Sequence, residues 1–342
     1  MVEDQQIILG IESSCDETSV GIVRNEHELL ANVITSQIKS HQRFGGVVPE
    51  VASRHHLEYI NYCIEEAIKQ AKIKKSDLNG IACTYGPGLA GCLMVGLTAA
   101  KVMAADLNLP FYGVNHMAGH IYAAAIDHKI KFPALALLVS GGHTEFVYMK
   151  DELSFEIIGT TLDDAVGEAY DKIGRLIGFN YPAGKTIDEA AKKGTANYEL
   201  PRPMMNRPDL NFSFSGLKTA VRDLVEKEKR HGTLEVNDLA ASFQEAVVEV
   251  LISKTKKALN QISVRELIVG GGVAANSLLK SKLIELIQID FPHCQLTIPP
   301  LRLCGDNGAM IAAFGSVLAK NQITSPLTLD SDPGLSFNFS LT

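Results

Sequence analysis

The chain contains the same order of predicted secondary structure twice. Apolar runs separated by polar turns predict strands at residues 6–10, 19–23 and 29–36, and the same triplet recurs at 134–140, 145–149 and 155–159. Each half then closes with a strand, a Gly-rich loop, a helix, a strand and a helix. Because an apolar sheet needs helices to cover its faces, the repeat predicts two α/β lobes built from duplicated βββαβα units.

Length and composition agree with two lobes. Of the 342 residues, 46% are hydrophobic and 21% are charged, so the chain can bury two sizeable cores. We expect an N-terminal lobe at residues 1–130 and a C-terminal lobe at 131–305. A last helix within 306–325 is expected to pack where the lobes meet, and 326–342 to form a tail.

Duplicated βββαβα units around a cleft describe the actin-like, sugar-kinase and Hsp70 ATPase architecture, a ribonuclease H-like α/β fold. In open α/β sheets, ligands bind beyond the strand ends, where Gly-rich turns meet helix N-termini. The turns at 140–142 and 270–272 are therefore predicted to contact a phosphate or a nucleotide.

Two histidines, His116 and His120, are four residues apart at the start of a predicted helix. A helix places both imidazoles on one face, where they can bind one metal ion. Asp306 follows the last strand of the second half as His116 follows that of the first. The repeat therefore predicts that the two helix starts face each other across the cleft. The alternatives are histidines hydrogen bonded to the backbone, and Asp306 as a helix N-cap.

Composition also limits the location and the ligands of the chain. The longest uncharged run, 81–100, is interrupted by Gly-Pro-Gly, so no membrane-spanning segment is expected, and the acidic residues 1–4 do not resemble a signal peptide. The six cysteines form no CxxC pair, which favours a reducing cytoplasm. The net charge of −7 argues against a surface coated for nucleic acid, although residues 185–231 contain ten Lys/Arg against seven Asp/Glu.

Six motifs follow one another along the chain: IESSCDET at 11–18, NHMAGH at 115–120, LVSGGHT at 138–144, FSFSGLKT at 212–219, GGVAAN at 271–276 and DNGAM at 306–310. In sequence and order they resemble those of the tRNA N6-adenosine threonylcarbamoyltransferase family, formerly described as O-sialoglycoprotein endopeptidases. The resemblance spans residue 8 to about residue 319. In two places the chain departs from the family pattern: Tyr-Pro-Ala-Gly-Lys at 181–185 replaces Tyr-Pro-Gly-Gly-Pro, and Gly305 replaces a threonine.

The resemblance implies transfer of a threonylcarbamoyl group from threonylcarbamoyl-AMP to N6 of adenine 37 in tRNAs that read ANN codons. It implies one divalent metal per subunit, with Fe²⁺ favoured and Zn²⁺ also possible, bound by His116, His120 and Asp306. It also implies adenylate contacts at Leu138, Val139, Ser140, Gly141, Gly142, Asp171, Gly184, Asp188 and Asn276.

The resemblance further implies a tRNA anticodon arm as substrate and two protein partners, an inactive paralogue of the same architecture and a P-loop ATPase. We expect the paralogue at the helix 89–105, with its small residues, and at the helix from Pro49. The basic segment is expected to guide the tRNA, through Arg202, Arg207, Lys218 and Arg222 among others. No catalytic residue is assigned, but Glu12, at the tip of the first hairpin, is a candidate general base.

Three other functions each fit part of the sequence. A metalloprotease fits a pair of histidines with an acidic third ligand, but Met117 stands where such enzymes carry a catalytic Glu. An ATP-dependent kinase or chaperone fits the architecture but has no use for the histidine pair. A non-catalytic scaffold would be expected to have lost some of the three metal ligands, all of which are present.

Overall fold

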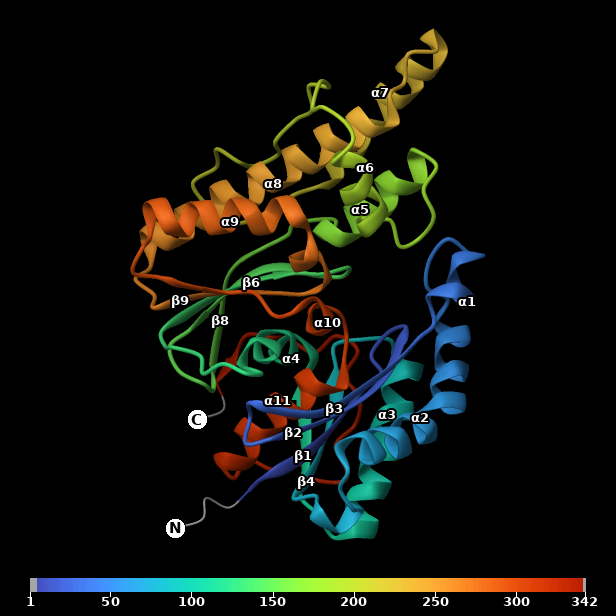
Figure 1. The fold of residues 1–342 in the computed structure, drawn as a ribbon, viewed down its shortest axis with the longest axis vertical. Coiled ribbons are helices and arrows are strands. Elements are labelled where there is room, and N and C mark those ends of the chain that lie inside the picture. The colour runs from blue at the N-terminus through green and yellow to red at the C-terminus, as the bar shows by residue number, and fades with distance from the viewer. Residues whose placement is uncertain (1–4, 341–342) are drawn as a thin grey trace. The chain divides into compact units, whose positions relative to one another are not determined.

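The computed structural model describes residues 5–340, so the prediction made for residues 1–4 lies outside the described part of the chain. The chain divides into two units (Figure 1). Unit 1 comprises Met1–Ile130 and Pro299–Phe339, and unit 2 comprises Lys131–Ile298 with Ser340–Thr342. The last helix therefore belongs to the first unit. The sequence-based expectation had placed residues 299–305 in the second lobe, whereas they belong to the first unit; that the last helix packs where the lobes meet stays a prediction.

Unit 1 is built on a five-stranded sheet in the order β3-β2-β1-β4-β5. Its strands are β1 (Ile7–Glu12), β2 (Glu17–Arg24), β3 (Glu28–Ser36), β4 (Gly80–Gly86) and β5 (Phe111–Asn115). Its helices are α1 (Ile38–Gln42), α2 (Pro49–Ala71), α3 (Ala90–Leu107), α4 (His116–Tyr122), α10 (Leu301–Cys304) and α11 (Gly308–Lys320), with 3-10 turns η1 (Lys75–Asp77) and η2 (Ala123–Ala125).

Unit 2 is built on a sheet in the order β10-β9-β6-β7-β8, to which the two-residue strand β11 (Phe339–Ser340) adds at the β8 edge. Its strands are β6 (Ala134–Val139), β7 (Thr144–Met149), β8 (Ser154–Thr160), β9 (Glu266–Gly270) and β10 (Gln295–Thr297). Its helices are α5 (Val166–Leu176), α6 (Gly184–Ala191), α7 (Ser215–His231), α8 (Val236–Gln261) and α9 (Ser277–Asp290), with the 3-10 turn η3 (Gly272–Ala275).

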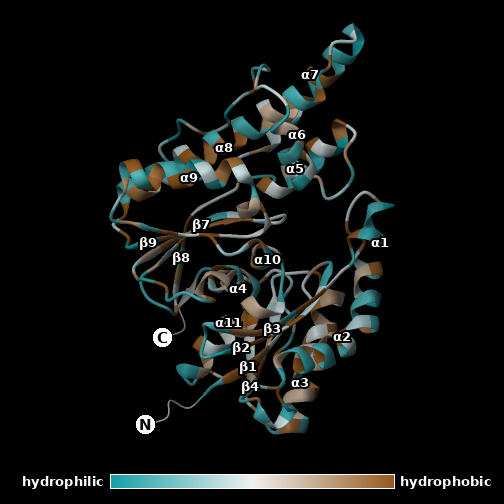
Figure 2. Ribbon diagram, in the orientation of Figure 1, coloured by the Kyte–Doolittle hydropathy of each residue, from teal (hydrophilic) through white to brown (hydrophobic). Residues whose placement is uncertain are grey.

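The two sheets repeat one topology. In each, the first three strands form an antiparallel meander, and the fourth and fifth add in parallel beside the first. The β1 and β6 strands at the centre are buried along their whole length, and both sheets are mostly brown, and therefore hydrophobic, in Figure 2. The predicted duplication of βββαβα units is thereby confirmed.

The two faces of the first sheet are covered by different helices. Side chains alternate along a strand, so Leu9 and Ile11 of β1 point to the face where the apolar residues of α2 and α3 complete the core. Gly10 and Glu12 belong to the opposite face. There, a Cβ on Gly10 would lie 2.3 Å from the backbone nitrogen of Ala312 in α11. The absence of a side chain at this position lets α11 lie directly on β1.

The helix α11 is held on β1 and β2 by backbone-to-backbone packing and by hydrogen bonds. A Cβ on Gly308 would lie 2.2 Å from the backbone nitrogen of Gly21, so both positions require glycine. The first free N–H groups of α11 donate to strand side chains: Gly308 N to Ser19 Oγ at 2.8 Å and Ala309 N to Asn32 Oδ1 at 3.3 Å. Residues just before α11 are thereby placed beside the end of β1.

The C-terminal segment beyond α11, predicted as a tail, lies along β4 and β5. Ser325 N donates to Phe111 O and Asp332 N donates to Tyr85 O, both at 2.8 Å. The amide of Asn115 donates to Ser336 O at 3.3 Å. This segment therefore contacts Asn115, the residue just before α4.

One helix of the described residues, α3, has the length and composition to cross a membrane, and 33% of its 18 residues are buried. Within unit 1 it packs on β4 and on α2. Its buried side chains, among them Leu97 and Ala100, belong to the core of that unit.

Candidate functional site

His116 and His120 are positioned by the start of α4. Asn115 caps this helix, its side-chain oxygen accepting from Met117 N at 2.8 Å. The sequence-based prediction that both histidines lie on one helical face is confirmed: their ring centroids are 4.7 Å apart. His116 is 8% and His120 is 1% exposed, so neither ring is a surface group.

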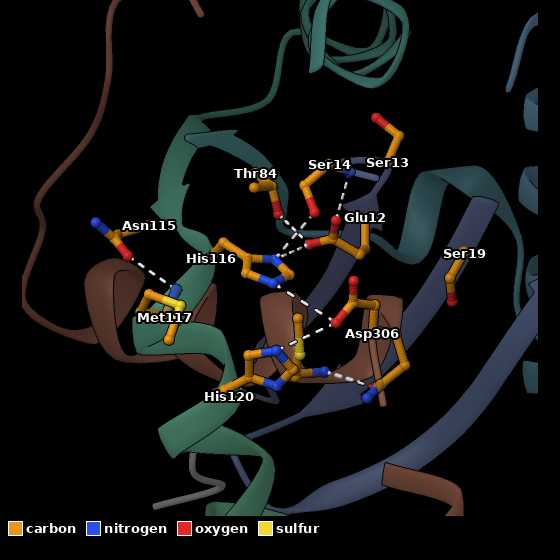
Figure 3. A network of polar contacts seen from close by, with 12 residues as sticks. Glu12, Ser13, Ser14, Ser19, Thr84, Asn115, His116, Met117, His120 and Asp306 are labelled. Atoms are coloured by element: carbon orange, nitrogen blue, oxygen red, sulfur yellow. Dashed lines mark hydrogen bonds and ion pairs between the residues drawn. The ribbon is translucent and has the colours of Figure 1, made fainter. Parts of the chain in front are cut away.

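Asp306 completes this cluster from the turn before α11. The cap of α11 is Asn307, whose side-chain oxygen accepts from Met310 N at 3.0 Å, so the carboxylate of Asp306 is not used as the cap. Asp306 Oδ1 lies 3.5 Å from His116 Nε2 and 3.1 Å from His120 Nε2 (Figure 3). All three residues belong to unit 1. The expectation that they face each other from different lobes is therefore wrong, because α11 returns to the first sheet.

The cluster fits a metal ion. Ligands about 2.1 Å from a tetrahedral ion are separated by about 3.4 Å, close to the two distances observed here. One ligand atom from each residue lies within 4.8 Å of the others. Neither ring nitrogen of His120 has a hydrogen-bond partner in the described part of the chain, although both are buried. Since Nε2 approaches Asp306 without hydrogen-bond alignment, a shared cation accounts for both observations.

The charges around His116 are negative. Burial lowers the pKa of His116, but the carboxylates of Glu12 and Asp306 outweigh it and raise that pKa to about 9. Burial, Asp16 and Asp306 together raise the pKa of Glu17 well above its usual value. A cation at this cluster would offset the repulsion among these carboxylates.

Glu12 lies behind His116. Its side chain is 0% exposed and Oε2 is 3.0 Å from His116 Nδ1. Thr84 Oγ1 donates to Oε2 at 2.5 Å and Ser14 N donates to Oε1 at 2.6 Å. Sequence reasoning missed Thr84, which lies near the end of β4, beside the end of β1.

The nine residues expected to contact an adenylate all lie in unit 2. Leu138 and Val139 end β6, and the turn after them leads into β7. The start of α5 lies against this turn, where Gly167 N donates to Ser140 O at 3.1 Å. Gly141 and Gly142 are exposed, and a Cβ on either would have no neighbouring atom within 4 Å. The second Gly-rich turn lies against the first, because a Cβ on Gly271 would be 2.4 Å from Val139 O.

The side chains of Asp171, Asp188 and Asn276 are each hydrogen bonded within unit 2. Asp171 Oδ1 accepts from Ala183 N at 2.8 Å, beside Gly184 at the start of α6. Asp188 Oδ1 accepts from Ser277 Oγ at 2.7 Å. Asn276 precedes Ser277, and its amide donates to Gln244 Oε1 at 2.7 Å and Tyr170 OH at 3.3 Å. Sequence reasoning missed Gln244 and Tyr170, which lie within helices and carry no motif.

The Tyr-Pro-Ala-Gly-Lys departure is accommodated without backbone strain. Ala183 has φ −93° and ψ −12°, an ordinary conformation for alanine. Gly184 has open space where a Cβ would stand, and the side chain of Lys185 is 88% exposed.

The fold and the site together define a class. Two units of repeated βββαβα topology form the fold of the actin-like ATPases and sugar kinases. Component A of (R)-2-hydroxyglutaryl-CoA dehydratase from Acidaminococcus fermentans is similar at a TM-score of 0.54 and 14% identity, over 92% of this chain and 99% of that one. Full-length HypF is similar at a TM-score of 0.59 and 15% sequence identity, over 94% of this chain and 47% of that one.

Within that class, the sequence decides the family. The family model for tRNA N6-adenosine threonylcarbamoyltransferase matches residues 28–313, and the chain belongs to this family. The enzyme of that name from Lactiplantibacillus plantarum is 54% identical over 99% of this chain and 97% of its own length. The Enterococcus faecalis enzyme is 52% identical over 98% of this chain and 97% of its own length. The Listeria monocytogenes enzyme is 51% identical over 98% of both chains. The predicted family and transferase class are thus confirmed.

Proposed function

We propose that the chain transfers the threonylcarbamoyl group of threonylcarbamoyl-AMP to N6 of adenine 37 in tRNAs that read ANN codons. The observation that supports this most is the identity of 51–54%, over nearly the full length, with enzymes named for the modification of N6 of a tRNA adenosine. Two groups of motif residues, one in each unit, agree with it.

The donor determines what the protein has to do. The mixed anhydride of the adenylate is already activated, so the enzyme's work is positioning and charge stabilisation. We assign the phosphate to the turn of Ser140, Gly141 and Gly142 at the start of α5, since helix N-termini attract anions. Asp171 and Asp188 are assigned as acceptors for ribose hydroxyls. The side-chain amide of Asn276, which is hydrogen bonded to Gln244, is assigned a position near the adenine base of the adenylate.

We further propose one divalent metal per subunit at His116, His120 and Asp306. Such a ligand set suits Fe²⁺ and Zn²⁺ alike, and iron is favoured by the family resemblance. When bound, the ion would supply Lewis-acid polarisation of a carbonyl group. The chain's own contribution is to hold the two rings through the cap at Asn115 and the carboxylate through the packing of α11.

Two protein partners are proposed with the enzyme, an inactive paralogue of the same architecture and a P-loop ATPase. We assign the paralogue to α2 and α3, which pack side by side in unit 1. Large apolar side chains are exposed there, including Leu57 at 65%, Met94 at 57% and Val102 at 63%. Ala100, expected to be part of this contact, is instead fully buried in the core, so a bulky residue there would test folding rather than binding.

The paralogue surface is tested with Met94→Glu/Val102→Glu. Ile289→Glu is a matched control on α9, because Ile289 is also exposed, at 71%. Loss of pairing in size-exclusion chromatography is expected for the double variant alone. Pairing that survives in it contradicts the assignment.

The tRNA is assigned to the basic residues of α7. The guanidinium of Arg202 is engaged, donating to Glu249 at 2.7 Å and to Glu245 at 3.4 Å, and Arg207 pairs with Asp209. Lys227 and Lys229 are exposed and form no ion pair in the described part of the chain. Unpaired lysines are suited to phosphate contacts, whose strength depends on salt.

Lys227→Glu/Lys229→Glu is expected to weaken tRNA binding and flatten its salt dependence. Lys72→Glu/Lys75→Glu makes the same charge change in unit 1, at exposed residues, and should leave both unchanged. Equal effects of the two variants would show that only net charge matters, and no effect would place the tRNA elsewhere.

The experiment that tests the function as a whole is nucleoside analysis of tRNA from cells depleted of this chain. Threonylcarbamoyladenosine should disappear and return on complementation with the wild type, but not with His120→Ala. A cytoplasmic location is proposed with this function, and the six free thiols agree with a reducing compartment. Unchanged modified nucleoside in depleted cells would refute the proposal.

A further inference from the structure

Glu12 is a buried carboxylate whose hydrogen bonds are all made within unit 1. It ends β1 on the face occupied by Gly10, and its side chain is 0% exposed. Oε1 accepts from Ser14 N at 2.6 Å, and Oε2 accepts from Thr84 Oγ1 at 2.5 Å. In Figure 3 the ring of His116 lies beside this carboxylate, with Nδ1 3.0 Å from Oε2.

The two nitrogens of His116 have different surroundings. Nδ1 faces the Glu12 carboxylate and lies 3.3 Å from Ser14 Oγ, whereas Nε2 faces Asp306 Oδ1 at 3.5 Å. A histidine that binds a cation does so as a neutral imidazole with one hydrogen, and an ionised carboxylate can only accept. A cation between His116, His120 and Asp306 takes the lone pair of Nε2, which faces Asp306, so the hydrogen belongs on Nδ1, where Glu12 accepts it.

We propose that Glu12 is the positioning residue of the metal centre: it holds His116 as the Nδ1–H tautomer with Nε2 directed at the cation. The inference rests on the metal site proposed above. Ligating histidines commonly donate their second N–H to a carboxylate, which orients the ring and strengthens it as a ligand. We propose this role in place of that of a general base. A base must come within hydrogen-bond reach of the proton it takes, and the side chain of Glu12 is 0% exposed.

The two donors to Glu12 explain why a carboxylate is required there. An amide in the same place has one accepting oxygen and one NH₂ group. If the oxygen accepts from His116, the NH₂ group faces Ser14 N–H, and two donors meet. If the oxygen faces Ser14, the NH₂ group faces Nδ1, which must then give up its hydrogen, so that Nε2 no longer offers a lone pair.

The test is Glu12→Gln, which conserves the volume of the side chain. Binding of Zn²⁺ alone is measured by competition with a chromophoric chelator, and about 10–100-fold weaker binding is expected. The matched control is Thr18→Val, which removes a buried hydrogen bond of 2.8 Å to another histidine of unit 1, His56, and should bind Zn²⁺ as the wild type does. Thermal melts of both variants report on folding.

A second readout needs no variant of Glu12. In Zn²⁺-loaded wild-type protein with ¹⁵N-labelled histidine, the signals absent from His116→Ala should show a protonated Nδ1 and a metal-bound Nε2. Metal bound to Nδ1 would overturn the proposal even if Glu12→Gln failed to fold. So would wild-type Zn²⁺ affinity in a folded Glu12→Gln protein, which together with lost transferase activity would point to a base. If the wild type bound no Zn²⁺ in a fixed ratio, the metal site itself would be refuted.

Discussion

The packing of α11 on the first sheet should control metal binding through Gly308, which is not itself one of the metal-binding residues. In Gly308→Ala, the new Cβ would stand 2.2 Å from the backbone nitrogen of Gly21, whereas ordinary contact begins at 3.4 Å. The shortfall is about 1.2 Å, and because the obstacle is backbone in the middle of a sheet, α11 has to move. Overpacking of this kind costs about 1–3 kcal/mol of folding free energy.

Asp306 is two residues before Gly308 and must move with it. Metal–ligand distances tolerate about 0.2 Å, so a shift several times larger should remove the carboxylate from the ligand set. We expect purified Gly308→Ala to lose most of its bound metal, as measured by elemental analysis after equilibration with Zn²⁺. The melting temperature should fall by a few degrees while the protein stays folded.

Gly305→Ala provides the matched control, because it makes the same change one residue from Asp306 on the other side. A Cβ there would meet nothing within 4 Å, and its φ of −82° suits alanine. This variant should keep its metal and its melting temperature. Full metal occupancy in Gly308→Ala, or equal losses in both variants, would refute the reasoning that backbone contact positions Asp306.

Three further predictions concern the metal ligands of unit 1 and two buried or hydrogen-bonded charged residues of unit 2, Asp163 and Lys254. His120→Ala and Asp306→Ala should each lose bound metal while far-UV circular dichroism is unchanged; full occupancy in either would remove that residue from the ligand set. Asp163→Ala removes the acceptor for two hydroxyls and two backbone N–H groups at the start of α7 and should cost about 1–2 kcal/mol in urea denaturation at neutral pH. Burial raises the pKa of Asp163, but those hydrogen bonds lower it below its usual value, so the wild-type advantage should vanish as the pH falls through the lowered pKa; an advantage that persists in acid would contradict this. Lys254→Met leaves the carbonyl of Asp209 without the buried ammonium that donates to it at 2.6 Å, so proteolysis within 201–214 should accelerate; an unchanged cleavage rate would show that Lys254 does not hold this segment.

The sequence alone predicted most of the secondary structure and the duplicated architecture. The helix α2, for example, was predicted to start at Pro49, where it begins in the structure, because proline favours the first turn of a helix and apolar residues recur after it at helical spacing. Strand triplets were recognisable because buried strands are apolar runs between polar turns. These signals are local, so a single sequence contains them.

The ligand set of the candidate metal site was also accessible from the sequence, since the spacing of His116 and His120 and the placement of Asp306 are matters of order along the chain. Its location was predicted wrongly. Whether the last helix returns to the first sheet depends on contacts between residues about 290 positions apart, such as Gly308 with Ser19, and no local pattern reports them.

What only the tertiary structure decided is the burial and the partners of each polar residue at the site. Glu12 was a candidate base by its position on a hairpin; in the structure it is fully buried, Ser14 N and Thr84 Oγ1 donate to it, and His116 Nδ1 lies 3.0 Å from it, the contacts on which its proposed positioning role rests. Arg202 was expected to help guide the tRNA, but its guanidinium pairs with Glu245 and Glu249. The sequence determines which groups are available and the elements that present them. Burial and partners, which set what a group can do chemically, come from packing across the whole unit.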